Sequence, residues 1–305
     1  MPRPVRGAVE VVLYNTEAYV IRTLPYGETH AIVTLLTPSG TIAAMARGAK
    51  KPQSRLAGGV QLCVKAMYTL YQGRGMGNIQ QLEVVDSYRK VREQLQLAAY
   101  GAYFCELVAA CSEERPNGSE AVYRWFGAAL DRLRDMRDKP QIIARIWEAK
   151  VLRLLGASPR WDRCVRCGEP LGGDPAGGET AYYLPGDGGF VCSSCLAVSR
   201  QDSAAGGSQQ GTSSGRTATS LGDLPSGRDV TSGAGRNPAI PVPLSVPRVL
   251  AQFSTVPWER IGTVKLGSVT EDAIRKVLRL QLHDYGGLSL KSRDFVDSID
   301  ELWSS

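Results

Sequence analysis

The sequence has no continuous run of about 18 apolar residues, the minimum for a helix that spans a membrane. The N-terminal residues 1–7 include two arginines, but no apolar signal core follows them. We therefore expect a cytoplasmic protein with no membrane partner. Thiols stay reduced in that compartment, so paired cysteines there favour metal binding over disulfides.

Histidine is nearly absent, with only His30 and His283 in 305 residues. Neither lies in a metal-ligand motif or beside an obvious nucleophile, and we expect His283 to meet the carbonyls at a helix end. The glycine-rich segment 73–77 lacks the Lys-Ser/Thr pair of a P-loop and the helix that follows a Rossmann turn. We interpret it as a hairpin loop that carries Arg74. The sequence therefore predicts a binding protein and not an enzyme.

Cysteine, in contrast, is present in seven copies, four of them in two Cys-x-x-Cys pairs: Cys164, Cys167, Cys192 and Cys195. Two such turns that face each other close a tetrahedral Zn²⁺ site, with no open position for a catalytic water. Gly168 follows the first pair, where the chain must turn sharply. The alternatives are two disulfides or a redox motif. We predict one structural zinc ion, its charge partly offset by Arg163 and Arg166.

The net charge of +6 lies entirely within residues 1–80, which contain nine basic and three acidic residues. A basic domain attached to a neutral remainder indicates an anionic partner; the alternative is a solvated face kept for solubility. Residues 47–55 hold four cations in a segment broken by glycine and proline. We predict nucleic-acid contacts from Arg22, Arg47, Lys50, Lys51, Arg55, Lys65 and Arg74. Tyr26, Tyr68 and Tyr71 either stack on unpaired bases or belong to the barrel.

Patterns of hydrophobicity divide the chain into an α+β multidomain protein. Residues 1–86 contain five strand patterns, including 60–71, which predict a small closed barrel. Residues 87–161 contain three amphipathic helices, and residues 240–305 contain further helices, with Thr270 as a predicted N-cap. The cysteine module occupies 162–198. The Ser/Gly-rich stretch 199–239 is too polar to bury a core, so we predict an insertion without fixed structure.

The combination of several segments resembles RecO, the bacterial recombination-mediator family. These segments occur in the family's order, and the resemblance covers nearly the whole chain except 199–239. The segments are residues 26–28 (YGE), 33–37 (VTLLT), 47–56 (RGAKKPQSRL), 71–75 (YQGRG), 162–168 (DRCVRCG) and 290–293 (LKSR). The chain departs from the family at 199–239, because the family passes quickly from the second cysteine pair to a helix.

The resemblance implies an N-terminal OB-fold β-barrel, then an α-helical domain with an inserted zinc-ribbon-like module. It also implies a role in DNA repair and recombination after DNA damage, in the RecF pathway on the bacterial nucleoid. Such proteins bind single- and double-stranded DNA, anneal complementary strands and, with RecR, help load RecA onto DNA coated by single-strand-binding protein (SSB). Lys291 and Arg293 are candidates to hold the acidic C-terminal tail of SSB. The alternative function is a zinc-ribbon/OB-fold protein that binds RNA or polymerase in transcription or translation.

Overall fold

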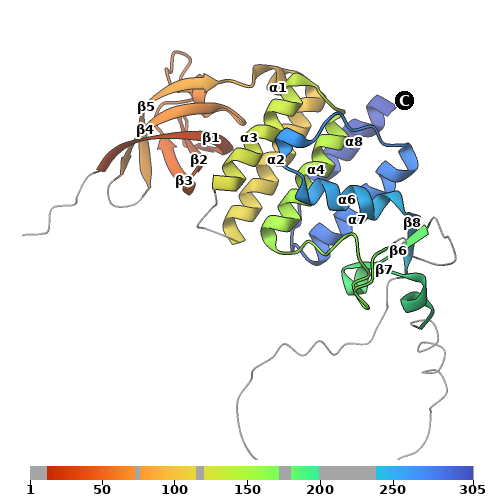
Figure 1. Ribbon diagram of the computed structural model, residues 1–305. Helices are drawn as coiled ribbons and strands as arrows, with labels where there is room; N and C mark the ends of the chain where they lie inside the picture. The colour runs from red at the N-terminus through yellow and green to blue at the C-terminus, as the bar shows by residue number, and fades with distance from the viewer. Residues whose placement is uncertain (1–11, 73–75, 115–119, 172–179, 199–237, 305) are drawn as a thin grey trace, which may run out of the picture. The chain divides into compact units, whose positions relative to one another are not determined.

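The structure is a computed structural model that describes residues 12–72, 76–114, 120–171, 180–198 and 238–304. The chain divides into two compact units (Figure 1). The first contains residues 1–158 and 252–305, and the second contains residues 159–251. Of the insertion predicted at 199–239, residues 199–237 lie outside the described residues.

The first unit begins with a closed barrel of five strands in the order β1-β2-β3-β5-β4, with β4 paired to β1. Two parallel pairs between β3 and β5 complete the closure, and all other neighbours are antiparallel. This is the topology of an OB fold, which confirms the predicted class. The strands are β1 (Val12–Tyr26), β2 (His30–Thr37), β3 (Gly40–Ala46), β4 (Lys65–Gln72) and β5 (Gly77–Asp86).

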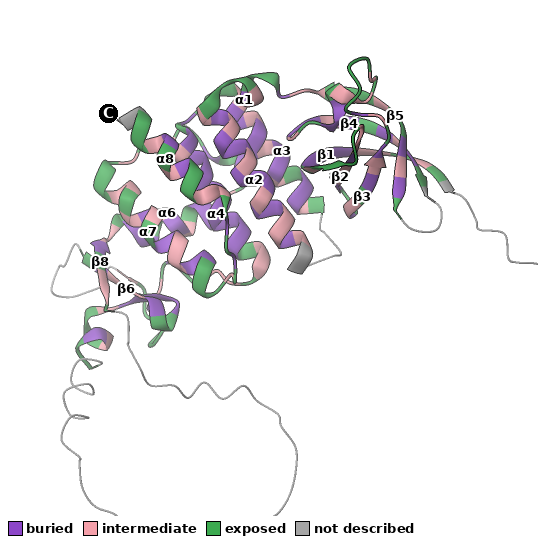
Figure 2. Cartoon of the chain, turned by 180° about the vertical axis from the view of Figure 1, so that it is seen from behind, coloured by how far each residue is buried: buried purple, intermediate pink, exposed green. Residues whose placement is uncertain are grey.

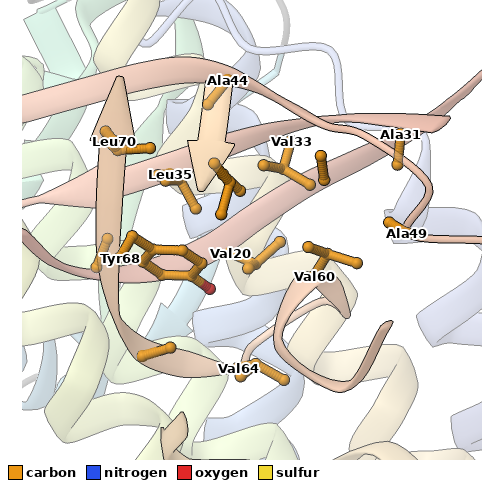
Figure 3. Close-up of a cluster of buried hydrophobic side chains, with 14 residues drawn as sticks. Val20, Ala31, Val33, Leu35, Ala44, Ala49, Val60, Val64, Tyr68 and Leu70 are labelled. Carbon is orange, nitrogen blue, oxygen red and sulfur yellow. The ribbon is translucent and has the colours of Figure 1, made fainter. Parts of the chain in front are cut away.

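Mostly aliphatic side chains fill the barrel, as Figure 3 shows for Val20, Val33 and Leu35. From His30 to Leu35 of β2 alternate residues are buried, because successive side chains of a strand point to opposite faces. A short 3-10 helix, η1 (Ala57–Val60), contributes Val60 to the same core. The outward positions remain available for polar and charged residues.

The structure corrects one expectation for the barrel and decides between two alternatives for a tyrosine. Residues 60–71 are not one strand: η1 ends at Val60, and a turn with Cys63 at φ +67° precedes β4. Of the two alternatives for Tyr68, the structure supports the barrel core, because Tyr68 is fully buried and its hydroxyl donates to the carbonyl of Gly59 at 2.6 Å. Sequence periodicity does not distinguish a buried aromatic from one at the rim.

The rest of the first unit is helical. The residues between the barrel and the cysteine module form α1 (Arg89–Glu93), α2 (Leu95–Glu114), α3 (Glu120–Asp135) and α4 (Pro140–Leu155). The C-terminal region holds α6 (Ser245–Thr255), of which residues 252–255 belong to this unit, η3 (Trp258–Arg260), α7 (Ser268–Asp284) and α8 (Ser292–Ser304). Pro140 begins α4, and Gly156 follows it with φ +73°, as the sequence predicts.

The helix α2 forms the middle of this unit and packs against α3, α4, α8 and β1. Its segment Leu95–Ser112 is long and apolar enough to cross a membrane by length and composition, although Gln96 and Glu106 interrupt its apolar run, and 61% of it is buried inside the protein. That burial, visible in Figure 2, is typical of a core helix. The barrel adjoins the helices through Tyr19, whose ring lies 5.0 Å from that of Tyr123 and 5.2 Å from that of Phe126.

The start of α7 differs from the prediction. Thr270 was expected to cap the helix, but α7 begins two residues earlier, after Gly267, and no side chain caps it. Thr270 is therefore an internal residue of the first turn. The acidic first turn and the stop at Gly286 and Gly287 agree with the sequence.

The second unit contains a three-stranded antiparallel sheet in the order β7-β6-β8. The strands are β6 (Thr180–Leu184), β7 (Gly189–Val191) and β8 (Ile240–Pro243). We expected residues 240–305 to belong to the helical domain, but β8 pairs with β6 next to the cysteine module. A four-residue strand rich in proline gave no alternating pattern from which this pairing was predictable.

Candidate nucleic-acid interface and metal centre

The loop after β3, residues 47–56, is fixed by three hydrogen bonds to its neighbours. The backbone N–H of Lys50 donates to the carbonyl of Thr29 at 2.9 Å, and the N–H of Gly48 donates to Nδ1 of His30 at 2.9 Å. Arg47 Nε donates to Oδ1 of Asn78 at 3.0 Å. The loop is thereby tied to the β1–β2 turn and to the first residues of β5.

The predicted cations of this loop lie on its outer side. Arg47, Lys50, Lys51 and Arg55 are all exposed, and none of them makes an ion pair with a residue that the structure describes. Ala49, in contrast, is buried in the barrel core and anchors the backbone between them. Four cations therefore project from one anchored loop, with the exposed Tyr26 at the end of the adjacent β1.

The sequence did not identify the residues that hold this loop. His30 accepts a backbone hydrogen bond through Nδ1, so its role is structural. Asn78 fixes the guanidinium of Arg47, and Gly48 adopts φ +68°, a conformation that favours glycine. Of these three residues, only Gly48 could have been identified from the sequence, since a glycine between charged residues is typical of a tight turn.

The other predicted nucleic-acid residues have different surroundings. Arg22 is exposed on β1 opposite Thr34, and Arg74 lies outside the described residues. Lys65 pairs with Glu17 at 2.9 Å, and its ammonium lies 5.5 Å from the ring centre of Tyr19. Burial raises the pKa of Glu17, but hydrogen bonds from Tyr123 and Lys65 outweigh it and leave that pKa lowered. Lys65 thus has a partner inside the protein.

Lys291 and Arg293 lie at the start of α8, beside the carboxylate of Glu106 from α2. Glu106 accepts the backbone N–H of Lys291 at 2.9 Å, and it accepts both the N–H (2.8 Å) and the hydroxyl of Ser292. Burial raises the pKa of Glu106, but these hydrogen bonds and the charge of Lys291 lower it overall. A carboxylate from within the protein therefore already occupies this helix end.

The four paired cysteines of the second unit meet at one point. Their sulfur atoms all lie within 4.8 Å of one another, and Cys167 Sγ is 3.8 Å from Cys192 Sγ. Cys164 is buried, whereas Cys167 is exposed. The site therefore has one protected side and one open to solvent.

The conformations of both cysteine turns are explained by residues next to them in the sequence. In the first turn, Gly168 adopts φ +78° and its N–H donates to the carbonyl of Cys164 at 2.9 Å. In the second, Cys192 precedes a helical turn at 193–198, and the N–H of Cys195 points to Cys192 Sγ at 3.4 Å. Turns of this kind present two sulfurs to one ion.

The electrostatics of the cluster favour thiolates at its buried side. Burial raises the pKa of Cys164, but backbone N–H groups of the two turns outweigh it and lower that pKa to about 6. Arg166 pairs with Asp187 and donates to the carbonyl of Cys195 at 3.4 Å. Four sulfur donors at this spacing suit a tetrahedral Zn²⁺ ion, so the residues fit the predicted metal.

Comparison with known proteins gives consistent matches along the chain. The family model "Recombination protein O N terminal" matches residues 11–88, and "Recombination protein O C terminal" matches residues 92–209. The DNA repair protein RecO of Bacillus subtilis is 31% identical over 294 residues, which are 95% of this chain and 96% of that protein. RecO of Shouchella clausii is 30% identical over 292 residues, with the same coverage. RecO of Listeria monocytogenes is 29% identical over 289 residues, 93% of this chain and 94% of that protein.

Proposed function

This chain belongs to the RecO family of DNA repair proteins, and from that premise we propose that it is a recombination mediator that acts by binding DNA, without catalysis. The family favours this function over our alternative of an RNA- or polymerase-binding protein. We place the protein in the cytoplasm, on the bacterial nucleoid.

The observation that carries the proposal is the anchored loop 47–56 with its four exposed, unpaired cations among the described residues. Lysine and arginine that neutralise phosphates release counterions, which gives an affinity that depends on salt and not on base sequence. Arg22 on β1 extends this set, Arg74 is a further candidate from the sequence, and Tyr26 offers an aromatic face to an unpaired base. Lys65 is left out because Glu17 neutralises it.

Binding of this kind is sufficient for strand annealing. Two single strands repel each other through their phosphates, and a surface that neutralises both lowers that repulsion until complementary bases pair. We therefore propose that the protein binds single- and double-stranded DNA and anneals complementary strands. With RecR as partner, it would help RecA replace SSB on single-stranded DNA.

Two further roles belong to the other parts of the molecule. One structural Zn²⁺ ion would stabilise the second unit, held by Cys164, Cys167, Cys192 and Cys195. It would cross-link the two cysteine turns and would take no part in a reaction. The acidic tail of SSB would bind to the helical part, for which Lys291 and Arg293 are the candidates from the sequence.

The test replaces three loop cations at once, in the variant Lys50→Ala/Lys51→Ala/Arg55→Ala. We expect weaker binding to all single-stranded oligonucleotides, and a slope of log K against log salt reduced by about 2, because each lost phosphate contact contributes about 0.7. Fluorescence anisotropy between 50 and 300 mM salt measures both, and annealing of complementary oligonucleotides, with and without SSB, measures the activity.

The matched control is Lys90→Ala/Arg260→Ala/Lys276→Ala, which removes the same charge from exposed positions outside the barrel. This variant should keep the wild-type salt slope. If the loop variant binds with unchanged affinity and slope, loop 47–56 is not the DNA site. If both variants lose affinity equally, the effect is one of net charge and the proposed site is wrong.

A further inference from the structure

Two cysteines outside the metal cluster lie side by side where the barrel meets the helices. Cys63 belongs to the turn between η1 and β4, and Cys105 belongs to α2, which packs against β1. Both residues are free thiols of the first unit, and their sulfur atoms are 3.6 Å apart. We call them the thiol pair. Neither DNA binding nor the proposed zinc site involves it.

The backbone of the barrel holds one member of the thiol pair in place. The N–H of Cys63 donates to the carbonyl of Val20 at 2.9 Å, and the N–H of Val20 donates to the carbonyl of Val64 at 2.9 Å. Cys63 adopts φ +67°, a conformation that is uncommon for residues other than glycine. Such a conformation persists where the surrounding structure enforces it. The turn therefore keeps the thiol of Cys63 against α2.

The helix α2 leaves room beside the sulfur of Cys63. Gly101 lies one helical turn before Cys105, and a Cβ at Gly101 would lie 3.1 Å from Cys63 Sγ. Bonded sulfur atoms are about 2.05 Å apart, so the two thiols must approach each other by about 1.5 Å to form a disulfide. Because Gly101 has no side chain, none obstructs this movement there.

The thiol pair is shielded from bulk solvent but is close to the surface. Cys63 is 2% exposed and Cys105 is 1% exposed, whereas Gln61, two residues before Cys63, is exposed. Burial raises the pKa of the Cys105 thiol, which therefore keeps its proton at neutral pH. Hydrogen peroxide is small and uncharged, so a local opening of the turn 61–64 is enough to admit it.

We propose that the thiol pair is a site of reversible oxidation, at which hydrogen peroxide joins Cys63 and Cys105 in a disulfide. The sulfur of Cys63 attacks one peroxide oxygen and the O–O bond breaks. The other oxygen leaves as water with the thiol proton, and Cys63 becomes a sulfenic acid. The sulfur of Cys105 then attacks the sulfenic sulfur, the S–S bond forms, and the hydroxyl leaves as water with the proton of Cys105. The two thiols thus lose two electrons, which reduce one peroxide to two waters.

The disulfide would tie the barrel to the helices for as long as peroxide is present. In the cytoplasm, where we place the protein, disulfides are typically transient, and a cellular dithiol reverses them by thiol–disulfide exchange. Cys63 and Cys105 are 42 residues apart in the sequence, so a bond between them restricts the unfolded chain and stabilises the first unit. The proposal does not depend on DNA binding, because the bond itself is measured.

The alternative is that Cys63 and Cys105 only fill space in the core, as buried cysteines commonly do. Both thiols would then stay reduced in the folded protein while peroxide oxidises the more exposed cysteines. The enforced backbone of Cys63 and the space left by Gly101 favour the disulfide.

The test treats the folded full-length protein with hydrogen peroxide, blocks the remaining thiols with iodoacetamide in urea, and maps the tryptic peptides by mass spectrometry. Cys63 lies in the peptide 56–65, and Cys105 lies in the peptide 93–124 together with Cys111. We expect the two peptides to be joined through Cys63 and Cys105, and to separate again after treatment with dithiothreitol. Oxidation should also raise the melting temperature of the first unit by about 10 °C.

The variant Cys105→Ala removes one partner, so it should give no joined peptides and no rise in melting temperature. The matched control is Cys111→Ala, at a buried position six residues further along α2, which should still form the disulfide. Both variants keep the four cysteines of the metal cluster, so oxidation there affects all three proteins alike.

The proposal is overturned if Cys63 and Cys105 of the folded wild type are both recovered with blocked thiols after peroxide has oxidised the metal cluster. It is also overturned if the disulfide forms only in urea, if Cys63 joins Cys111 instead, or if Cys63 stops at a sulfinic acid. An equal rise in melting temperature for folded Cys105→Ala would contradict it as well. If Cys105→Ala does not fold, the peptide map of the wild type still decides.

Discussion

Individual charged residues in this protein fall into two groups according to their partners. Lys65 and Glu106 both have partners within the protein, because Lys65 pairs with Glu17 and Glu106 accepts hydrogen bonds from the start of α8. Lys50 and Lys51 have no such partner among the described residues and meet the solvent. A charged pair within the fold contributes to stability, whereas an exposed and unpaired cation is available for a ligand. Whether a charged residue is structural or available for a ligand therefore depends on whether it has a partner within the protein, and not on its residue type.

The contribution of Glu106 to stability can be tested by substitution. The variant Glu106→Gln should lower the free energy of unfolding by about 1 kcal/mol at pH 7, because the charged cap of α8 is lost. The lowered pKa of Glu106 means that its contribution is present above the pKa of the unfolded state and disappears as pH falls through the folded value. Urea unfolding of wild type and variant should therefore converge as the pH falls through the lowered pKa of folded Glu106. A difference that is constant between pH 7 and pH 3 would contradict the charged cap.

At the scale of elements, short turns position both candidate sites. The loop 47–56 follows β3 and is held by Thr29, His30 and Asn78, so its cations project from an anchored backbone. The two cysteine turns bring four sulfurs together in the second unit, whose sheet is small and whose apolar core includes Cys164, Val191 and Leu196. We expect a module with so small a core to depend on a bound metal for its stability. We therefore expect metal binding and DNA binding to be separable.

The element-scale prediction is that Cys192→Ser removes zinc and unfolds the second unit only. Metal analysis should find zinc in the wild type and none in the variant, and proteolysis should cut the variant within residues 159–251. The affinity of the barrel for single-stranded DNA should stay within about twofold, since loop 47–56 belongs to the first unit. Ser194→Ala, an exposed position between the same two cysteines, is the control and should retain zinc. Absence of zinc from the purified wild type would contradict the site.

At the scale of the whole molecule, the barrel and the helices of the first unit share a core. Tyr19 of the barrel is 4% exposed and packs on Tyr123 and Phe126 of α3, and burial raises its pKa to about 12. Gly127 makes room for it, because a Cβ there would lie 2.4 Å from the tyrosine hydroxyl. The aromatic cluster continues from Phe126 to Trp147 of α4. The barrel therefore packs against the helical part in part through this aromatic seam.

Removal of the Tyr19 side chain tests how much this aromatic seam contributes to the stability of the whole molecule. Tyr19→Ala should lower the free energy of unfolding by about 3–5 kcal/mol, the cost of deleting a buried aromatic side chain. Calorimetry should show the barrel and the helices melting separately in the variant. Tyr26→Ala, at an exposed site, should leave the melting temperature unchanged and weaken single-stranded DNA binding. A single unshifted transition for Tyr19→Ala would contradict the seam.

Particular elements show what could be predicted from the chain. The five strands, the helix from Pro140 to its glycine stop and the four cysteine ligands follow from periodicity, turn residues and spacing, which are local properties. The pairing of β8 with β6, the burial of Tyr68 and the ion pair of Lys65 did not follow from them. Each of these depends on residues far apart in the sequence, whose contacts form only when the chain has folded.

The sequence by itself therefore determined the family, the barrel, the helices, the cysteine cluster and the concentration of positive charge in residues 1–80, because composition and short-range pattern encode them. Only the tertiary structure decided which cations are unpaired, which carboxylate occupies the start of α8, and that the thiols of Cys63 and Cys105 lie side by side. The reason is physical: the partner of a charge, and the burial of an apolar side chain, are set by long-range packing.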